Sequence, residues 1–176
     1  MVKSSNNNIL ITGYPGVGKT TLVVKLAALL HDMRPAGFFT SEIRENRIRK
    51  GFELVSLAGK RGVLSHVGIR SPYRVGKYGV DVGGFNRFLS TLDLLNSRSS
   101  LIVIDEIGRM ECFSSEFENL LENILDSEKR LIATVARRGG GIIERIKRRR
   151  DIILFEVTTA NRDSLLKKIV ALVQKQ

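Results

Sequence analysis

The feature that most constrains this chain is a glycine-rich segment between a short apolar run and a helical pattern. Residues 13–20 read Gly-Tyr-Pro-Gly-Val-Gly-Lys-Thr, which fits the pattern G-x-x-x-x-G-K-[ST] in full. The apolar run 9–12 before it predicts a buried strand, and apolar residues recur at helical spacing after it, over 22–30. A strand, a glycine loop and a helix in that order open the parallel sheet of an α/β fold.

This spacing has a chemical reason. Glycines let successive backbone N–H groups turn inward around a phosphate, and the helix that begins near Gly18 adds the positive end of its dipole. We expect Lys19 to reach the β- and γ-phosphates and the Thr20 hydroxyl to bind Mg²⁺. A helix start without a ligand is the alternative, and the matching strand and helix disfavour it. The predicted nucleotide-binding residues here are Gly13, Tyr14, Pro15, Gly16, Val17, Gly18, Lys19, Thr20 and Thr21.

A second polar pair follows another apolar run. Residues 101–104 read Leu-Ile-Val-Ile and lead directly into Asp105 and Glu106. An acid at the carboxyl end of a buried strand lies at the ligand-binding edge of an α/β sheet. We expect Asp105 to hold Mg²⁺ and Glu106 to act as the general base on an attacking water. An acid that only caps the next turn is the alternative.

The segment between these two sites has a different pattern. Three short runs typical of strands, at 37–44, 50–57 and 61–66, are joined by turns too short for parallel crossovers. They predict an antiparallel strand insertion around residues 37–66. Strand–helix alternation then resumes and continues to the C-terminus. We predict one domain over residues 1–176, a three-layer sandwich of the Rossmann-like P-loop NTPase type with a mostly parallel sheet.

Two helices are expected in the second half of the chain from their apolar spacing. One carries Phe85 and Phe88 and extends to Leu95. The other begins near a capping box formed by Ser115 and Glu118.

Composition limits the location and the partners. One cysteine, Cys112, excludes an internal disulfide, and the two histidines lack metal-ligand spacing. No apolar run approaches the roughly 20 residues that span a bilayer. We expect a cytoplasmic protein, monomeric and without a membrane partner. The excess of 29 basic over 18 acidic residues, a net charge of +11, would attract nucleotides or nucleic acids alike.

Other candidate residues carry weaker signals. Thr134 ends a predicted strand. It either contacts the γ-phosphate or is present only because threonine favours β-strands. Arg109 either supplies positive charge to the transition state or is a surface arginine. Residues 161–163, Asn161, Arg162 and Asp163, contact the base or ribose, or only open the last helix.

The basic run 145–150 has two interpretations. Nucleic-acid backbone binding is one, and a solvated helix face is the other. No aromatic residue interleaves for base stacking, which favours the solvated face.

Several of these segments together resemble one family. They are 13–22, 37–44, 75–80, 104–111 and 161–163, and the run Asp-Glu-Ile-Gly-x-Met-Glu with the downstream Asn-Arg-Asp is the most specific part. The chain is similar to the cancer-related nucleoside-triphosphatase family of small single-domain P-loop NTPases.

The resemblance implies Mg²⁺-dependent hydrolysis of ATP, GTP, CTP and UTP with little base preference. It also implies that Arg109, Glu111 and residues 161–163 lie near the site. Two departures are present: the family usually has lysine where this chain has Arg109, and the stretch 137–141, Arg-Arg-Gly-Gly-Gly, does not match the family pattern.

We therefore predict a nucleoside-triphosphate hydrolase that cleaves the β–γ phosphoanhydride. A small nucleoside or nucleotide kinase is the alternative enzyme, although 145–150 lacks the helical-hairpin pattern of a kinase lid. An RNA-associated nucleotide switch is the alternative outside enzymes, suggested by the net charge of +11 and by the basic run 145–150.

Overall fold

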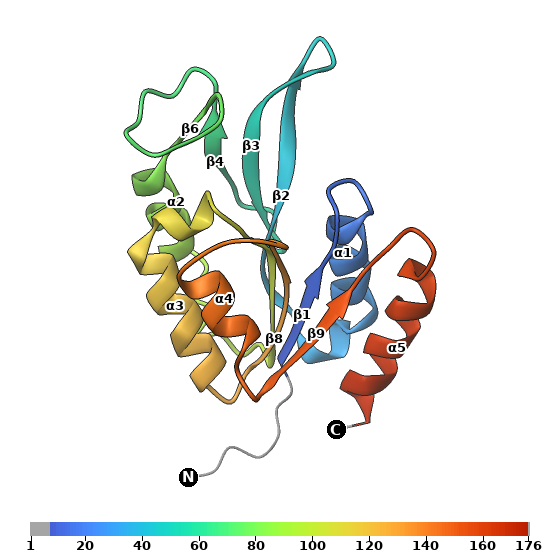
Figure 1. Ribbon diagram of the computed structural model, residues 1–176. Helices are drawn as coiled ribbons and strands as arrows, with labels where there is room; N and C mark the ends of the chain where they lie inside the picture. Colours follow the sequence, from blue (N-terminus) through green and yellow to red (C-terminus); the bar gives the residue numbers. More distant parts are fainter. Residues whose placement is uncertain (1–7, 176) are drawn as a thin grey trace.

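A single sheet of nine strands runs through the whole molecule, in the order β5-β6-β4-β3-β2-β7-β8-β1-β9 (Figure 1). The computed structural model describes residues 8–175. The five strands at one end are parallel, with β1 between β8 and β9 and with β7 between β2 and β8. Their bounds are Asn8–Thr12 (β1), Ala36–Glu45 (β2), Leu101–Ile107 (β7), Arg130–Val135 (β8) and Ile152–Glu156 (β9).

The other end of the sheet is antiparallel. Strand β2 continues past its parallel pairing with β7 into a hairpin with β3, and β4, β6 and β5 follow with antiparallel pairings. The predicted insertion around 37–66 is confirmed, and the sheet as a whole is mixed: the parallel pairings occur at the end that carries the glycine loop. The bounds are Ile48–Ser56 (β3), Arg61–His66 (β4), Arg74–Val75 (β5) and Tyr78–Val80 (β6).

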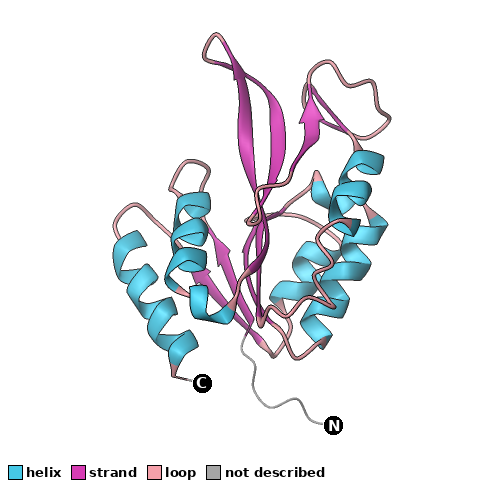
Figure 2. Cartoon of the chain, turned by 180° about the vertical axis from the view of Figure 1, so that it is seen from behind, coloured by secondary structure: helices cyan, strands magenta, loops and turns pink. Residues whose placement is uncertain are grey.

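Helices cover both faces of the sheet and complete three layers (Figure 2). On one face lie α1 (Lys19–Leu29) and α5 (Arg162–Gln174). The opposite face carries α2 (Val82–Ser90), α3 (Ser115–Asp126) and α4 (Ile142–Lys147). Two 3₁₀ turns, η1 (His31–Met33) and η2 (Glu111–Phe113), occur in connections. Within residues 8–175, no helix is long and apolar enough to cross a membrane.

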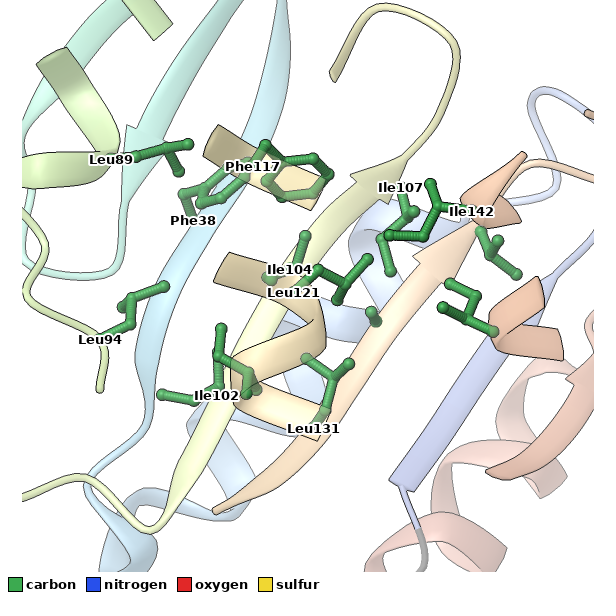
Figure 3. Packing of buried hydrophobic residues seen from close by; sticks show 14 of the residues in the cluster. Phe38, Leu89, Leu94, Ile102, Ile104, Ile107, Phe117, Leu121, Leu131 and Ile142 are labelled. Carbon is green, nitrogen blue, oxygen red and sulfur yellow. The ribbon is translucent and has the colours of Figure 1, made fainter. Parts of the chain in front are cut away.

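Each helical layer has its own core. Phe38 of β2 contacts Phe85, Phe88 and Phe117 edge-on, with ring centroids 5.8–6.4 Å apart, and this cluster joins α2, α3 and the sheet (Figure 3). A second cluster joins β1 to α1 and α5 through residues such as Leu26 and Ile169. Successive side chains of the buried parallel strands point to opposite faces of the sheet and pack in one core or the other. This explains why these strands are apolar on both faces.

Two sequence-based helix boundaries were wrong. Helix α3 is capped by Ser114, whose hydroxyl accepts the Phe117 N–H at 3.0 Å, and not by Ser115. Helix α2 ends at Ser90, so Leu95 lies in the following turns. At the end of α2, the Thr91 hydroxyl donates a hydrogen bond to the Phe88 carbonyl oxygen. In both helices, a local side-chain hydrogen bond therefore marks a boundary that apolar spacing does not define.

Candidate active site

The glycine loop connects β1 to α1 with the backbone conformation that its sequence demands. Gly16 has φ 81° and Gly18 has φ 93°, backbone angles that residues with a Cβ atom rarely adopt. A Cβ at position 18 would also lie 2.7 Å from Nη1 of Arg162, so the start of α5 packs directly behind the loop. The loop is therefore fixed by both its glycines and its neighbour.

Lys19 points back over this loop. Its Nζ donates to the carbonyl oxygens of Gly13 at 3.1 Å and Tyr14 at 3.2 Å. The ammonium is held above the loop at the position from which it can reach phosphate oxygens.

Asp105 joins the loop to the centre of the sheet. Its Oδ2 accepts a hydrogen bond from the Thr20 hydroxyl at 2.7 Å, and its Oδ1 accepts one from Thr134 at 2.5 Å. Asp105 is 1% exposed. Burial raises its carboxyl pKa, while the hydrogen bonds from Thr134, Thr20 and the Thr40 backbone act in the opposite direction. Groups from strands β2, β7 and β8 and from the start of α1 thus meet at this carboxylate.

Glu106 lies beside Asp105 and is half-buried. Burial raises the pKa of its carboxyl, the Lys19 charge lowers it and the Asp105 charge raises it. Glu106 lines a cavity of about 540 Å³, which we call the nucleotide cavity, together with the loop residues Gly13, Pro15, Gly16, Gly18, Lys19 and Thr20.

This donor set fits a hard divalent cation. Thr20 and Asp105 offer oxygen atoms side by side, which is the ligand type that Mg²⁺ prefers, and Mg²⁺ is usually held by one or two protein oxygens plus substrate phosphates. Among residues 8–175, no cluster of three or more acidic, histidine or cysteine side chains could hold a metal. The oxygen atoms of Thr20 and Asp105 would leave coordination positions of such an ion for phosphate oxygens and water.

Several residues of the nucleotide cavity were missed by sequence reasoning. The β2–β3 hairpin contributes Thr40, Ser41, Glu42, Arg49 and Phe52. They lie beyond the carboxyl end of the segment of β2 that pairs in parallel with β7. Ligands bind at this edge of an α/β sheet, so the predicted strand at 37–44 was the one sequence feature that pointed to them.

Arg137 was also missed as a site residue, and it follows β8 at the same edge. Its guanidinium carbon lies 3.6 Å from the ring centroid of Tyr14, and its Nη2 lies 3.3 Å from Oε1 of Glu156. Arg137 and Ala136 both line the nucleotide cavity. A guanidinium stacked on Tyr14 therefore lines the same cavity as Lys19.

Arg109 and Glu111 lie in a second cavity, which Glu106 also lines. This second cavity, of about 200 Å³, is formed by Thr40, Phe52, Leu64, Val75, Glu106, Gly108, exposed Arg109, Met110 and Glu111. Glu111 is 5% exposed, and burial raises its carboxyl pKa to about 8. Neighbouring Cys112 packs against the core, and burial raises its thiol pKa to about 12, as for an inert packed thiol.

Residues 161–163 lie beside the glycine loop at the start of α5. Arg162 Nη1 is 3.5 Å from the Val17 carbonyl oxygen. The Asn161 side chain bonds its own loop, since Nδ2 donates to the Glu156 carbonyl and Oδ1 accepts the Thr158 N–H. Asp163 is exposed.

The basic run is partly neutralised by acidic partners. Arg145 pairs with Glu122, and Arg149 pairs with Asp126 and Asp151. These pairs favour the solvated helix face over a nucleic-acid surface.

A family model described as NTPase matches residues 8–170 of this chain. The chain belongs to this NTPase family. This NTPase is 43% identical over 167 residues to "Nucleoside-triphosphatase THEP1" of Thermotoga maritima, covering 94% of this chain and 95% of that protein. It is 39% identical over 184 residues to "Cancer-related nucleoside-triphosphatase" of Homo sapiens, covering 95% and 96%.

Solved structures agree with the sequence matches. The NTPase superposes on the crystal structure of THEP1 from Aquifex aeolicus with a TM-score of 0.85 and 36% identity, covering 94% of this chain and 98% of that one. A solution structure of a human cancer-related nucleoside triphosphatase gives a TM-score of 0.83 and 37% identity, covering 97% and 98%. The resemblance found in the sequence and the predicted fold class are confirmed.

Proposed function

We propose that this chain is an Mg²⁺-dependent hydrolase of nucleoside triphosphates that releases a nucleoside diphosphate and phosphate. The observation that carries the proposal is the meeting of Thr20 and Asp105 at 2.7 Å, with Glu106 lining the cavity above the glycine loop. Family membership supports hydrolysis, and the donor set supports the choice of metal.

The loop and Lys19 bind the triphosphate. Backbone N–H groups of residues 13–20 surround the phosphates, and the Lys19 ammonium neutralises charge on the β- and γ-phosphates. Thr20 and Asp105 would hold Mg²⁺, and the ion would supply positive charge that stabilises the phosphate oxygens. Catalysis then consists mainly of positioning and charge stabilisation.

Glu106 acts on water. Its carboxylate accepts a hydrogen bond from a water facing the γ-phosphate and takes the proton as the new P–O bond forms. Arg137 contributes positive charge from the other side of the cavity. We assign no role in this step to Arg109, which lines the second cavity.

Weak base selectivity follows from the residues beside the loop. Residues 161–163 are proposed to flank the base and ribose. One hydrogen bond from Nδ2 and one to Oδ1 hold the Asn161 side chain against its own loop, which restricts the contacts that it could make to a base. ATP, GTP, CTP and UTP are therefore proposed as substrates.

The test is phosphate release from these four triphosphates with Mg²⁺ or with EDTA. We expect Glu106→Gln to lower kcat by about 10²–10⁴-fold, the usual value of a general base, with triphosphate Kd little changed. Lys19→Ala should lose both binding and turnover, and Glu116→Gln, on an exposed position of α3, is the matched control. Metal-independent release, or near-normal turnover by Glu106→Gln, would refute the mechanism.

Location and assembly are further parts of the proposal. A cytoplasmic monomer agrees with the lone Cys112. Size-exclusion chromatography with light scattering at several protein concentrations tests the monomer; a concentration-independent mass near twice 19.7 kDa would contradict it.

A further inference from the structure

The second cavity adjoins the nucleotide cavity and shares three residues with it. Thr40, Phe52 and Glu106 line both. The shared residues come from the β2–β3 hairpin and from β7, and the other lining residues come from β4, β5 and the segment that leads into η2. The second cavity therefore lies between the antiparallel insertion and the segment that carries η2. Among the described residues that line the two cavities, Glu106 is the only acid common to both: the salt-bridged Glu42 lines the nucleotide cavity alone, and the buried Glu111 lines the second cavity alone.

The walls of the second cavity are largely apolar and held in place. Phe52, Leu64, Val75 and Met110 contribute most of the apolar surface. The Phe52 ring packs edge-on against Tyr78 at 5.6 Å, and the Arg49 guanidinium lies over both rings at 5.2 and 5.8 Å. Hydrogen bonds from Arg49 to Glu42 and to the Tyr78 hydroxyl fix that guanidinium. The cavity wall is therefore built from the insertion, which hydrolysis alone does not require.

The charge in the second cavity is also limited. The carboxyls of Glu106 and Glu111 lie on either side of Gly108, where a Cβ would be 3.2 Å from Glu106 Oε1 and 3.0 Å from Glu111 Oε2. Glu111 accepts hydrogen bonds from backbone N–H groups, and its raised pKa keeps it mostly protonated at neutral pH. The Glu106 carboxylate and the Arg109 guanidinium in the lining carry opposite charges, and the remaining walls are mainly apolar. An uncharged molecule with one hydroxyl group and an apolar body therefore suits these surroundings better than an anion.

We propose that the second cavity binds a small uncharged alcohol and that Glu106 directs its hydroxyl, in place of water, at the γ-phosphate. A volume of about 200 Å³ admits a molecule of several non-hydrogen atoms, since a water occupies about 30 Å³. The protein would then be a phosphotransferase toward such alcohols as well as a hydrolase. The proposal rests on the proposed function, because it uses the same triphosphate and the same base.

The reaction balances without another reactant. The alcohol oxygen forms a bond to the γ-phosphorus, and the bond from that phosphorus to the β–γ bridging oxygen breaks. The alcohol proton passes to the Glu106 carboxylate and then to solvent, the nucleoside diphosphate leaves, and a phosphate monoester is the second product.

The experiment measures partitioning between alcohol and water. The full chain is incubated with Mg²⁺, γ-labelled ATP and one of methanol, ethanol, 1-propanol or 1-butanol at equal molarity, and labelled phosphate and alkyl phosphate are separated. We expect the ester-to-phosphate ratio to exceed the alcohol-to-water molar ratio and to rise by about three- to fourfold per added CH₂, because each CH₂ enters an apolar space. Val75→Trp, which fills the second cavity, should remove this excess.

Val63→Trp is the matched control, because Val63 is an exposed residue of the neighbouring strand β4 outside the second cavity. Ratios that equal the molar ratio for all four alcohols, while phosphate is released normally, would overturn this proposal alone. An excess that survives in Val75→Trp would also overturn it, since the alcohol would then bind elsewhere. Absence of both products would overturn the proposed function together with it.

Discussion

The Thr20 hydroxyl donates a hydrogen bond of 2.7 Å to Oδ2 of Asp105, a residue 85 positions away along the chain. This bond joins the first turn of α1 to the end of β7, on the two elements that carry the phosphate loop and the acidic pair. The second oxygen of the same carboxylate accepts the Thr134 hydroxyl at 2.5 Å. Asp105 is therefore oriented from both sides by threonines that stand on different elements.

The Thr20 hydroxyl is predicted to be needed for metal use. Thr20→Val removes the oxygen and keeps the shape, so the Mg²⁺ concentration that gives half-maximal turnover should rise by about 10–100-fold, the usual cost of disturbing a metal site. Thr20→Ser retains a hydroxyl and should stay within about threefold of the wild type. Metal titrations of phosphate release provide the measurement. A Val variant with the wild-type Mg²⁺ requirement would show that Thr20 is not a ligand.

Thr134 is predicted to stabilise the fold by satisfying Asp105. Thr134→Val leaves one oxygen of a buried carboxylate without its donor, at a cost of about 1–3 kcal/mol in the free energy of unfolding. Thr12→Val is the matched control at the end of β1, because the buried Thr12 hydroxyl has no hydrogen-bond partner. That variant should be neutral or stabilising. Urea unfolding of both proteins tests the contrast, and equal losses would contradict it.

The elements that could be predicted from the sequence are those that a local pattern of residue types defines. The glycine loop, the apolar strands around it and the acidic pair at 105–106 each follow from residue type and spacing, and the antiparallel insertion followed from turns too short for crossovers. Helix ends were less accurate, as the cap at Ser114 shows, because one hydroxyl decides them.

The walls of the two cavities could not be read from the sequence. Arg137 reaches the glycine loop by stacking on Tyr14, and Phe52, on a strand of the insertion, lines the same two cavities as Glu106. Both arrangements depend on how strands distant in sequence are ordered in the sheet. Local patterns carry no such information, so the second cavity and its buried Glu111 appear only in three dimensions.

Arg137 is predicted to assist turnover. Its guanidinium lines the nucleotide cavity at the end of β8, within reach of the space above the loop. Arg137→Ala should lower kcat at least about tenfold, less than the 10³–10⁵ of an arginine finger, because Lys19 remains. Arg138→Ala removes the adjacent exposed charge and should change kcat less than about twofold. Steady-state kinetics at saturating Mg²⁺ and ATP separate the two. Equal changes of kcat in Arg137→Ala and Arg138→Ala would show that Arg137 contributes no more than an ordinary surface charge.

Glu111 is predicted to make stability fall as pH rises. Its pKa is about 8 in the folded protein, raised by burial and by the charges of Glu106 and Asp105 from the ordinary 4.5 of a glutamate carboxyl. Between these two values the folded state keeps a proton that the unfolded state releases. The free energy of unfolding therefore decreases with increasing pH through this window, and the contribution is constant below about pH 4 and above about pH 9.

Glu111→Gln removes this titration while keeping an oxygen that accepts a backbone hydrogen bond. The difference in unfolding free energy between the variant and the wild type should shift in favour of the variant by roughly 2–4 kcal/mol from pH 5 to pH 8. Glu116→Gln makes the same change of charge at an exposed position and is the control. Urea unfolding at pH 5, 6, 7 and 8 measures the effect. Parallel pH profiles for wild type and Glu111→Gln would mean that Glu111 is ionised in the folded protein at neutral pH, and that the second cavity carries two negative charges.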